Sequence, residues 1–180
     1  MNLRLNYVLS RSRANGPGLR YTIWVQGCSI RCPGCSNIDT WDPAGGYEIG
    51  VYELLDMIRQ EKAKGFLDGI TITGGEPLDQ YPSIYYLCGS LFGLINIFLT
   101  TGYTMRQLIQ SKSWGINEVV DILCVGPFDK NKICSGEWKG SSNQILLYLT
   151  ESGEQQSLMP VIKKEYCIKP GQVIKTGFTQ

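Results

Sequence analysis

Three cysteines within eight residues constrain this chain more than any other feature. Cys28, Cys32 and Cys35 form a C-x3-C-x2-C pattern, and no fourth cysteine lies close by in the sequence. Thiolates are the usual protein ligands of iron–sulfur clusters, so three of them predict a [4Fe–4S] cluster whose fourth iron is open to another ligand. A structural zinc site needs four closed ligands, and the chain has no histidine to supply one. Zinc would therefore require a distant cysteine.

Length and composition favour one compact domain in a reducing compartment. The chain has 180 residues, 43% of them apolar, which is enough to bury roughly two-thirds of its unfolded surface. Residues 1–10 lack the apolar run of a signal peptide, and no apolar segment is long enough to span a bilayer. We therefore expect a cytoplasmic protein with free thiols and no membrane contact. The net charge of +1, with both signs interspersed, gives no reason to expect nucleic acid as a partner.

Strand-like apolar runs alternate with helical patterns, which is typical of βαβ units and a mainly parallel α/β sheet. Strands are predicted at 21–25, 69–73, 96–100, 119–124 and 144–150, and helices at 50–64, 82–93 and 104–112. The three cysteines and Gly74-Gly75 both follow strands, at the end of a parallel sheet where ligands bind. Residues 126–143 form a turn-rich loop that is too long for a plain connection.

The last thirty residues indicate a small β appendage. Residues 166–168 and 173–174 have strand character, and Pro170-Gly171 between them predicts a turn.

A second motif, Thr71-Ile-Thr-Gly-Gly-Glu-Pro77, follows the cysteines. The cysteine spacing resembles the cluster loop of the radical S-adenosylmethionine (radical SAM) enzymes, and the second motif resembles the Gly-Gly-Glu element of that superfamily. The resemblance implies a [4Fe–4S] cluster held by Cys28, Cys32 and Cys35. It also implies that S-adenosylmethionine binds the open iron and is cleaved reductively to a 5′-deoxyadenosyl radical, with no catalytic residue beyond these two cofactors.

Further segments resemble one family within this superfamily, the activating proteins of anaerobic ribonucleoside-triphosphate reductase. The segments follow one another in the family's order: Asn15–Arg20, Thr100–Tyr103, Asp121–Phe128 and Trp138–Gln144. The resemblance implies a partial, laterally open (β/α) barrel over residues 1–150, with residues 151–180 as a C-terminal β extension of the same domain. It also implies a larger glycyl-radical enzyme as the protein substrate and a flavodoxin- or ferredoxin-type electron donor.

Three features depart from the family pattern. Ser36 stands where an aromatic residue near the adenine is usual, Val125 replaces an acidic residue, and the tail beyond residue 150 is longer than in compact members. Two alternatives therefore stay open. One is a radical SAM enzyme that abstracts hydrogen from a peptide or small molecule, with the tail closing its pocket. The other is a non-enzymatic iron–sulfur or zinc protein.

The two motifs also supply candidate cofactor-binding residues. Gly74 and Gly75 would let the backbone approach the methionyl group, because a Cβ at either position would intrude. Glu76 would accept a hydrogen bond from the bound amino group, or else be a solvated loop carboxylate. Thr73 and Thr100 end neighbouring strands and would line the same pocket, although threonine also suits strands for its β propensity.

The remaining candidates lie later in the chain. Asp121 is flanked by apolar residues in a predicted central strand, so its carboxylate needs a ligand or backbone partner. Ser142 and Asn143 would contact the cofactor or order the 126–143 loop. The other thiols are predicted to be small, buried or partly buried side chains: Cys88, Cys124, Cys134 and Cys167.

Overall fold

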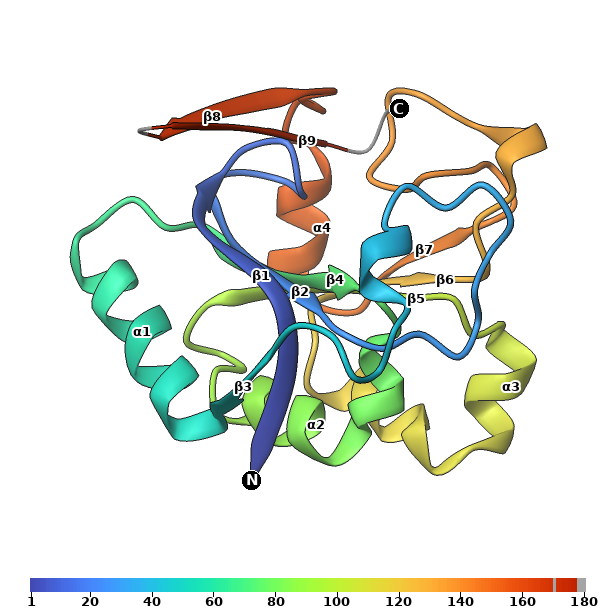
Figure 1. Ribbon diagram of the computed structural model, residues 1–180, viewed down its shortest axis with the longest axis horizontal. Helices are drawn as coiled ribbons and strands as arrows, with labels where there is room; N and C mark the ends of the chain where they lie inside the picture. The colour runs from blue at the N-terminus through green and yellow to red at the C-terminus, as the bar shows by residue number, and fades with distance from the viewer. Residues whose placement is uncertain (170, 178–180) are drawn as a thin grey trace.

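The computed structural model describes residues 1–169 and 171–177, which form a mixed α/β fold on one large sheet (Figure 1). Parallel strands make the centre of this sheet: β2 (Arg20–Val25), β4 (Gly69–Gly74), β5 (Asn96–Thr101) and β6 (Ile122–Val125). Antiparallel strands extend it at both sides: β1 (Asn2–Ser12), β3 (Tyr47–Gly50) and β7 (Ile145–Tyr148). The order across this seven-stranded sheet is β3-β1-β2-β4-β5-β6-β7.

Helices cover one face of the sheet more fully than the other (Figure 1). The covered face carries α1 (Val51–Ala63), α2 (Tyr81–Gly89) and α3 (Met105–Gln110). On the opposite face lie α4 (Glu151–Ser157) and a separate hairpin of β8 (Glu165–Lys169) and β9 (Gln172–Thr176). Short 3₁₀ segments occupy several loops: Ile38–Thr40, Pro77–Gln80, Lys112–Glu118 and Lys130–Lys132. None of the described helices is long and apolar enough to cross a membrane.

Alternation along the parallel strands gives the sheet two different faces. One in-register row is wholly aliphatic and joins the main core with α1 and α2: Ile23, Ile72, Leu99 and Leu123. The next residue of each strand points to the opposite face and forms a row of mixed polarity: Trp24, Thr73, Thr100 and Cys124. The first face therefore belongs to the core, and the second is free to carry a site.

The predicted order of strands and helices is confirmed, with shifts at some boundaries. The strand predicted at 119–124 begins only at Ile122, because a 3₁₀ segment continues to Glu118. The helix predicted at 82–93 ends at Gly89, and the helix predicted at 104–112 ends at Gln110. The predicted strands near the C-terminus are confirmed as β8 and β9, whereas the start of the predicted β extension is wrong, since residues 151–157 form the helix α4. Pro170 of the predicted turn lies outside the described residues.

A buried arginine ties the sheet to the tail of the chain. Arg20 is fully buried, and its guanidinium donates hydrogen bonds to the Ile70 carbonyl at 2.6 Å and to the Asn96 side chain at 2.9 Å. It also donates to Gln156 Oε1 of α4 at 2.7 Å. A buried charge is costly unless it is hydrogen-bonded, so these partners stabilise both the sheet and the placement of α4.

Asp121 lies just before β6, at the amino-terminal edge of the parallel strands, and is not at the predicted cofactor site. Its Oδ2 accepts a hydrogen bond from the Ile97 N–H at 2.8 Å, and its Oδ1 accepts one from Thr150 Oγ1. Its charge also attracts the buried guanidinium of Arg20. The predicted need for a partner is met by the protein itself, and Asp121 joins β5, β6 and the start of α4.

We expect Asp121→Ala to lower the free energy of unfolding by about 2–4 kcal/mol, because the buried Ile97 N–H loses its acceptor and the buried Arg20 loses the attraction of a nearby negative charge. Urea denaturation measures the change. Asp56→Ala is the control, since Asp56 is exposed and pairs only with Arg59 at the surface, where about 0.5 kcal/mol is typical. A loss for Asp121→Ala no larger than that of the control would contradict the structural role.

Candidate active site

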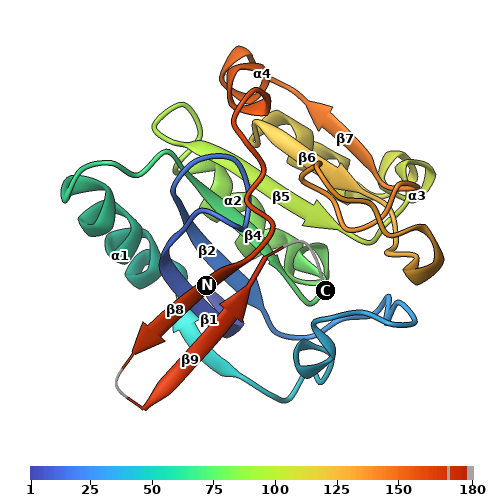
Figure 2. The same ribbon diagram turned by 90° about the horizontal axis from the view of Figure 1, so that it is seen from above.

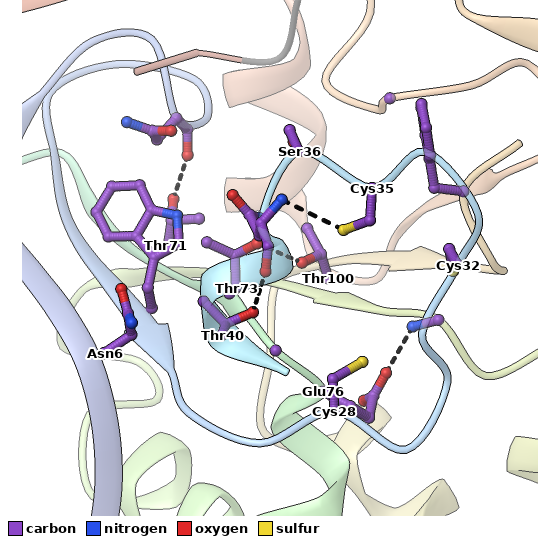
Figure 3. A pocket seen from close by; sticks show the side chains of 18 of the residues that line it. Asn6, Cys28, Cys32, Cys35, Ser36, Thr40, Thr71, Thr73, Glu76 and Thr100 are labelled. Carbon is purple, nitrogen blue, oxygen red and sulfur yellow. Dashed lines mark hydrogen bonds between the residues drawn. The ribbon is translucent and has the colours of Figure 1, made fainter. Parts of the chain in front are cut away.

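A cavity of about 770 Å³ lies at the carboxyl ends of the parallel strands (Figure 3). Its walls come from the cysteine loop, defined here as residues 26–37, from the ends of β4 and β5, from residues 126–144, and from β9. Most of the predicted site residues line it: Cys28, Cys32, Cys35, Thr73, Gly74, Gly75, Glu76 and Thr100. The fold thus brings both sequence motifs to one space.

Three residues of the cysteine loop have positive φ: Gly27, Arg31 and Gly34. Gly34 has φ +78° directly after Pro33, and the Cys35 N–H donates to the Cys32 carbonyl at 3.1 Å, which closes a tight turn between these two thiols. Arg31 has φ +51°, a conformation that is uncommon for a residue with a Cβ.

Backbone N–H groups point at the three sulfur atoms. Arg31 N donates to Cys28 Sγ at 3.5 Å, Asn37 N donates to Cys35 Sγ at 3.4 Å, and Cys32 receives a backbone hydrogen bond from Phe128. Burial raises the pKa of Cys28 and of Cys32, and these N–H groups act against that rise. Such donors stabilise the thiolate, which is the form that ligates iron.

The three thiols surround one end of the cavity without converging. In the part of the chain that the structure describes, no three His, Cys, Asp or Glu side chains form a group that could hold a metal ion as they stand. The donor set nonetheless fits a [4Fe–4S] cluster, because three cysteines of one loop face a common space and each sulfur has an N–H donor. In such a cluster each cysteine would ligate a different iron, so the three sulfurs need not meet at a single metal ion.

Gly74 and Gly75 are needed for contact between protein segments. A Cβ at Gly75 would lie 2.0 Å from the Gly27 carbonyl oxygen, and a Cβ at Gly74, where φ is +103°, would lie 2.6 Å from Val25 N. A side chain at either position would therefore displace the strand end and the loop that carry Cys28, which is a second reason for glycine here. Clearance for the methionyl group stays a prediction.

Glu76 is a buried carboxylate, which excludes the alternative of a solvated loop carboxylate. Its Oε1 accepts hydrogen bonds from Leu78 N at 3.0 Å and Thr101 Oγ1 at 2.8 Å, and its Oε2 accepts one from Gly102 N at 2.7 Å. Burial raises the pKa of Glu76 to about 7, although these hydrogen bonds oppose the shift. The side chain fastens the turn after β4 to the turn after β5.

Thr73 and Thr100 meet on the cavity face, with Thr100 Oγ1 donating to Thr73 Oγ1 at 2.9 Å. Trp24 and Cys124 continue their row on either side and also line the cavity. The sequence does not single out Trp24, and it predicts Cys124 only as a buried thiol. Cys124 is indeed buried, which raises its pKa to about 12 and keeps it protonated. Both Trp24 and Cys124 lie in register with Thr73 and Thr100, so the alternation of side chains along each strand is the sequence signal that places them on the cavity face.

The Gly-Ser-Ser-Asn-Gln segment approaches the cavity through residues other than those predicted. Ser142 and Asn143 are exposed and do not line it, and Asn143 Nδ2 donates to the Pro127 carbonyl at 2.8 Å. Gln144 does line the cavity; its Oε1 accepts from Gly140 N at 2.9 Å and its Nε2 donates to the Gly126 carbonyl at 2.9 Å. The segment therefore orders the loop, which was the alternative to cofactor contact.

Comparisons with known proteins agree with this arrangement. The model of a family described as 4Fe-4S single cluster domain matches residues 14–147. The anaerobic ribonucleoside-triphosphate reductase-activating protein of Enterobacteria phage T4 is 30% identical over 137 residues, which cover 73% of this chain and 85% of that protein. Its counterpart in Vibrio cholerae is 31% identical over 142 residues, which cover 73% of this chain and 89% of that protein. The chain belongs to the family of anaerobic ribonucleoside-triphosphate reductase-activating proteins.

A second group of activating enzymes matches a shorter part of this activating-protein chain. The pyruvate formate-lyase-activating enzyme of Clostridium pasteurianum is 40% identical over 81 residues, which cover 43% of this chain and 33% of that enzyme. Together with the 4Fe-4S domain, these relatives confirm the radical SAM resemblance and imply a [4Fe–4S] cluster and S-adenosylmethionine as cofactors.

In this activating-protein chain, we expect Gly75→Ala to impair cluster assembly and S-adenosylmethionine binding together, because the added Cβ would displace Gly27 next to Cys28. Iron and sulfide content after anaerobic reconstitution measures the first, and equilibrium dialysis measures the second. Gly50→Ala is the control, since φ is −65° and its Cβ would lie 3.9 Å from that of Glu53. Full iron content together with lost S-adenosylmethionine binding would instead show that Gly75 is needed for clearance of the methionyl group.

The raised pKa of Glu76 predicts a pH dependence of stability. Between pH 4.5 and pH 7 Glu76 binds more protons in the folded chain than in the unfolded chain. Its contribution to the free energy of unfolding is therefore fully present below pH 4.5 and is lost as the pH rises through about 7. We expect the free energy of unfolding of the unchanged protein to fall by up to about 3 kcal/mol relative to that of Glu76→Gln across this range. Urea denaturation of the cluster-free protein at several pH values tests this, and a constant difference would contradict it.

Proposed function

We propose that this chain is a glycyl-radical activase that uses a [4Fe–4S] cluster to cleave S-adenosylmethionine reductively and generates a glycyl radical on a larger partner, an anaerobic ribonucleotide reductase. One observation carries the proposal: the three-cysteine loop and the Gly-Gly-Glu turn line a single cavity in a chain of the activating-protein family. The names of the relatives favour a protein glycine over a free peptide or metabolite as the substrate.

The residues of the cavity have separate parts in this reaction. Cys28, Cys32 and Cys35 would ligate three irons as thiolates, supported by the N–H groups that point at their sulfurs. When bound, the cluster and S-adenosylmethionine supply a carbon radical that takes a hydrogen atom from a glycine Cα. Gly74, Gly75 and Glu76 form the turn after β4 that packs against the cysteine loop and would lie next to the bound cofactor. Thr73 and Thr100 offer hydroxyl groups on its floor.

A protein substrate needs an open approach to this cavity. We propose that the sheet acts as a partial, laterally open barrel over residues 1–150, with residues 151–180 as its extension. Support comes from the strand order, in which β3 and β7 stand at opposite edges and are not paired with each other in the described sheet. The exposed residues Ser29, Arg31 and Gly34 would let a flavodoxin- or ferredoxin-type donor of the cytoplasm approach the cluster.

We expect anaerobic incubation of the reconstituted protein with dithionite, S-adenosylmethionine and the partner reductase to yield the doublet of a glycyl radical on the partner. Electron paramagnetic resonance detects the doublet, and chromatography detects 5′-deoxyadenosine and methionine. Cys28→Ala should give neither and should bind fewer than about four irons per chain, because it lacks one iron ligand.

Cys167→Ala is the matched control, since this thiol lies on the C-terminal hairpin and does not line the cavity. It should keep both the cluster and the doublet. Formation of 5′-deoxyadenosine that follows hydrogen loss from a small peptide or metabolite, with no radical on the reductase, would replace the proposed substrate with the alternative.

A further inference from the structure

The C-terminal hairpin builds one wall of the cavity. β9 contributes Gln172, Ile174 and Thr176, alternate residues that share one face of the strand, and also Lys175 from the other face. Seen from above, the hairpin lies across the part of the sheet that contains β1 and β2 (Figure 2). The match to the 4Fe-4S single cluster domain ends at residue 147, so this wall lies beyond the part shared with that family.

Polar contacts fix one end of this hairpin to the connection between β1 and β2. Glu165 Oε2 accepts hydrogen bonds from Ser12 Oγ at 2.6 Å and Arg13 N at 3.0 Å. Thr176 Oγ1 donates to Asn15 Oδ1 at 2.9 Å. Glu165 and Thr176 pair with each other across the hairpin, so both contacts hold the same end and set its position over the cavity.

The cavity beneath β9 differs chemically from the cysteine end. Figure 3 shows Asn6 and Thr71 at one side and the three cysteines at the other, with Thr73 and Thr100 between them. The cavity is also lined by the rings of Tyr7 and Trp24, whose centroids are 5.9 Å apart, and by Asn6 and Gln172, whose side chains carry amide groups. Lys175 is the only cation among the described residues that line the cavity. This end therefore offers amides and aromatic faces, with little to bind an anion.

An extended polypeptide fits this end better than a small charged ligand does. Side-chain amides donate to and accept from peptide groups, and aromatic faces bury apolar contact area. β9 pairs only with β8 in the described hairpin, so its second edge is open to a further strand, as in recognition by strand addition. The 770 Å³ cavity is also in the upper part of the usual range for a single small ligand.

Resting on the proposed function, we propose that β9, as a wall of this cavity, binds the extended glycine-bearing segment of the protein partner and so determines which substrate is accepted. The segment lies along Gln172, Ile174 and Thr176, with its glycine toward the cysteine end. The tail beyond residue 150 is then a substrate-recognition element of this particular chain.

Two neighbouring residues of β9 provide a matched test. Ile174 faces the cavity, whereas Val173 lies on the opposite face of the strand, is 64% exposed and does not line the cavity. We expect Ile174→Glu to weaken binding of the full-length partner reductase at least tenfold and Val173→Glu to change it less than twofold. Calorimetric titration of the reductase into cluster-loaded protein without reductant measures this binding before any chemistry. Val173→Glu, which lies outside the cavity, should retain partner-free formation of 5′-deoxyadenosine under reducing conditions.

The outcomes separate this inference from the proposed function. Equal binding by the unchanged protein and both variants, or an equal loss in both, would overturn the assignment of the cavity face of β9. If the unchanged protein cleaves S-adenosylmethionine but forms no glycyl radical on the reductase, the proposed function itself is wrong. A radical on the reductase together with normal binding by Ile174→Glu overturns the hairpin inference alone.

Discussion

The contact between the turn after β4 and the cysteine loop is the constraint on which the site depends. Gly75 N donates to the Val25 carbonyl at 2.9 Å, and Glu76 N donates to the Gly27 carbonyl at 2.8 Å. The backbones approach so closely that Gly75 has no room for a side chain. Because Cys28 follows Gly27 directly, the position of the first thiol is set by this turn. The buried carboxylate of Glu76 extends the same restraint to the end of β5 through Gly102.

Much of the parallel sheet could be predicted because its strands are short apolar runs separated by glycine and polar turns. β1 escaped prediction for a physical reason: its pairing with β2 shifts register between Leu5 and Tyr7 and again between Leu9 and Ser12, so the alternation of buried residues is broken. α4 carries Gly153 in its interior, where it packs against the Asp121 carbonyl, and glycine weakens the helical signal. Tertiary contacts decide both elements.

The site residues that belong to motifs with fixed spacing in the sequence could be predicted. The residues whose role depends on where the side chain points in the folded protein could not. The three cysteines and the Gly-Gly-Glu turn belong to the first kind. Asp121 belongs to the second, because the late start of β6 moves it out of the strand and to the amino-terminal edge of the sheet. Ser142 and Asn143 lie in an irregular loop, where no periodicity tells which side chains turn inward. The burial that shifts the pKa of Glu76 likewise arises from segments far away in sequence.

The tail is coupled to the cavity by a continuous set of hydrogen bonds. Thr71 Oγ1, on the cavity face of β4, donates to the Asn15 carbonyl at 2.6 Å, and the Asn15 side chain in turn accepts from Thr176 of β9. The buried guanidinium of Arg20 donates hydrogen bonds to Thr71 Oγ1 and to Gln156 Oε1 of α4. Since the guanidinium has no access to water, it cannot exchange these partners for solvent without cost. The floor of the cavity and its hairpin wall are therefore positioned by the same connection between β1 and β2, and a segment bound along β9 would act on the strand ends through it.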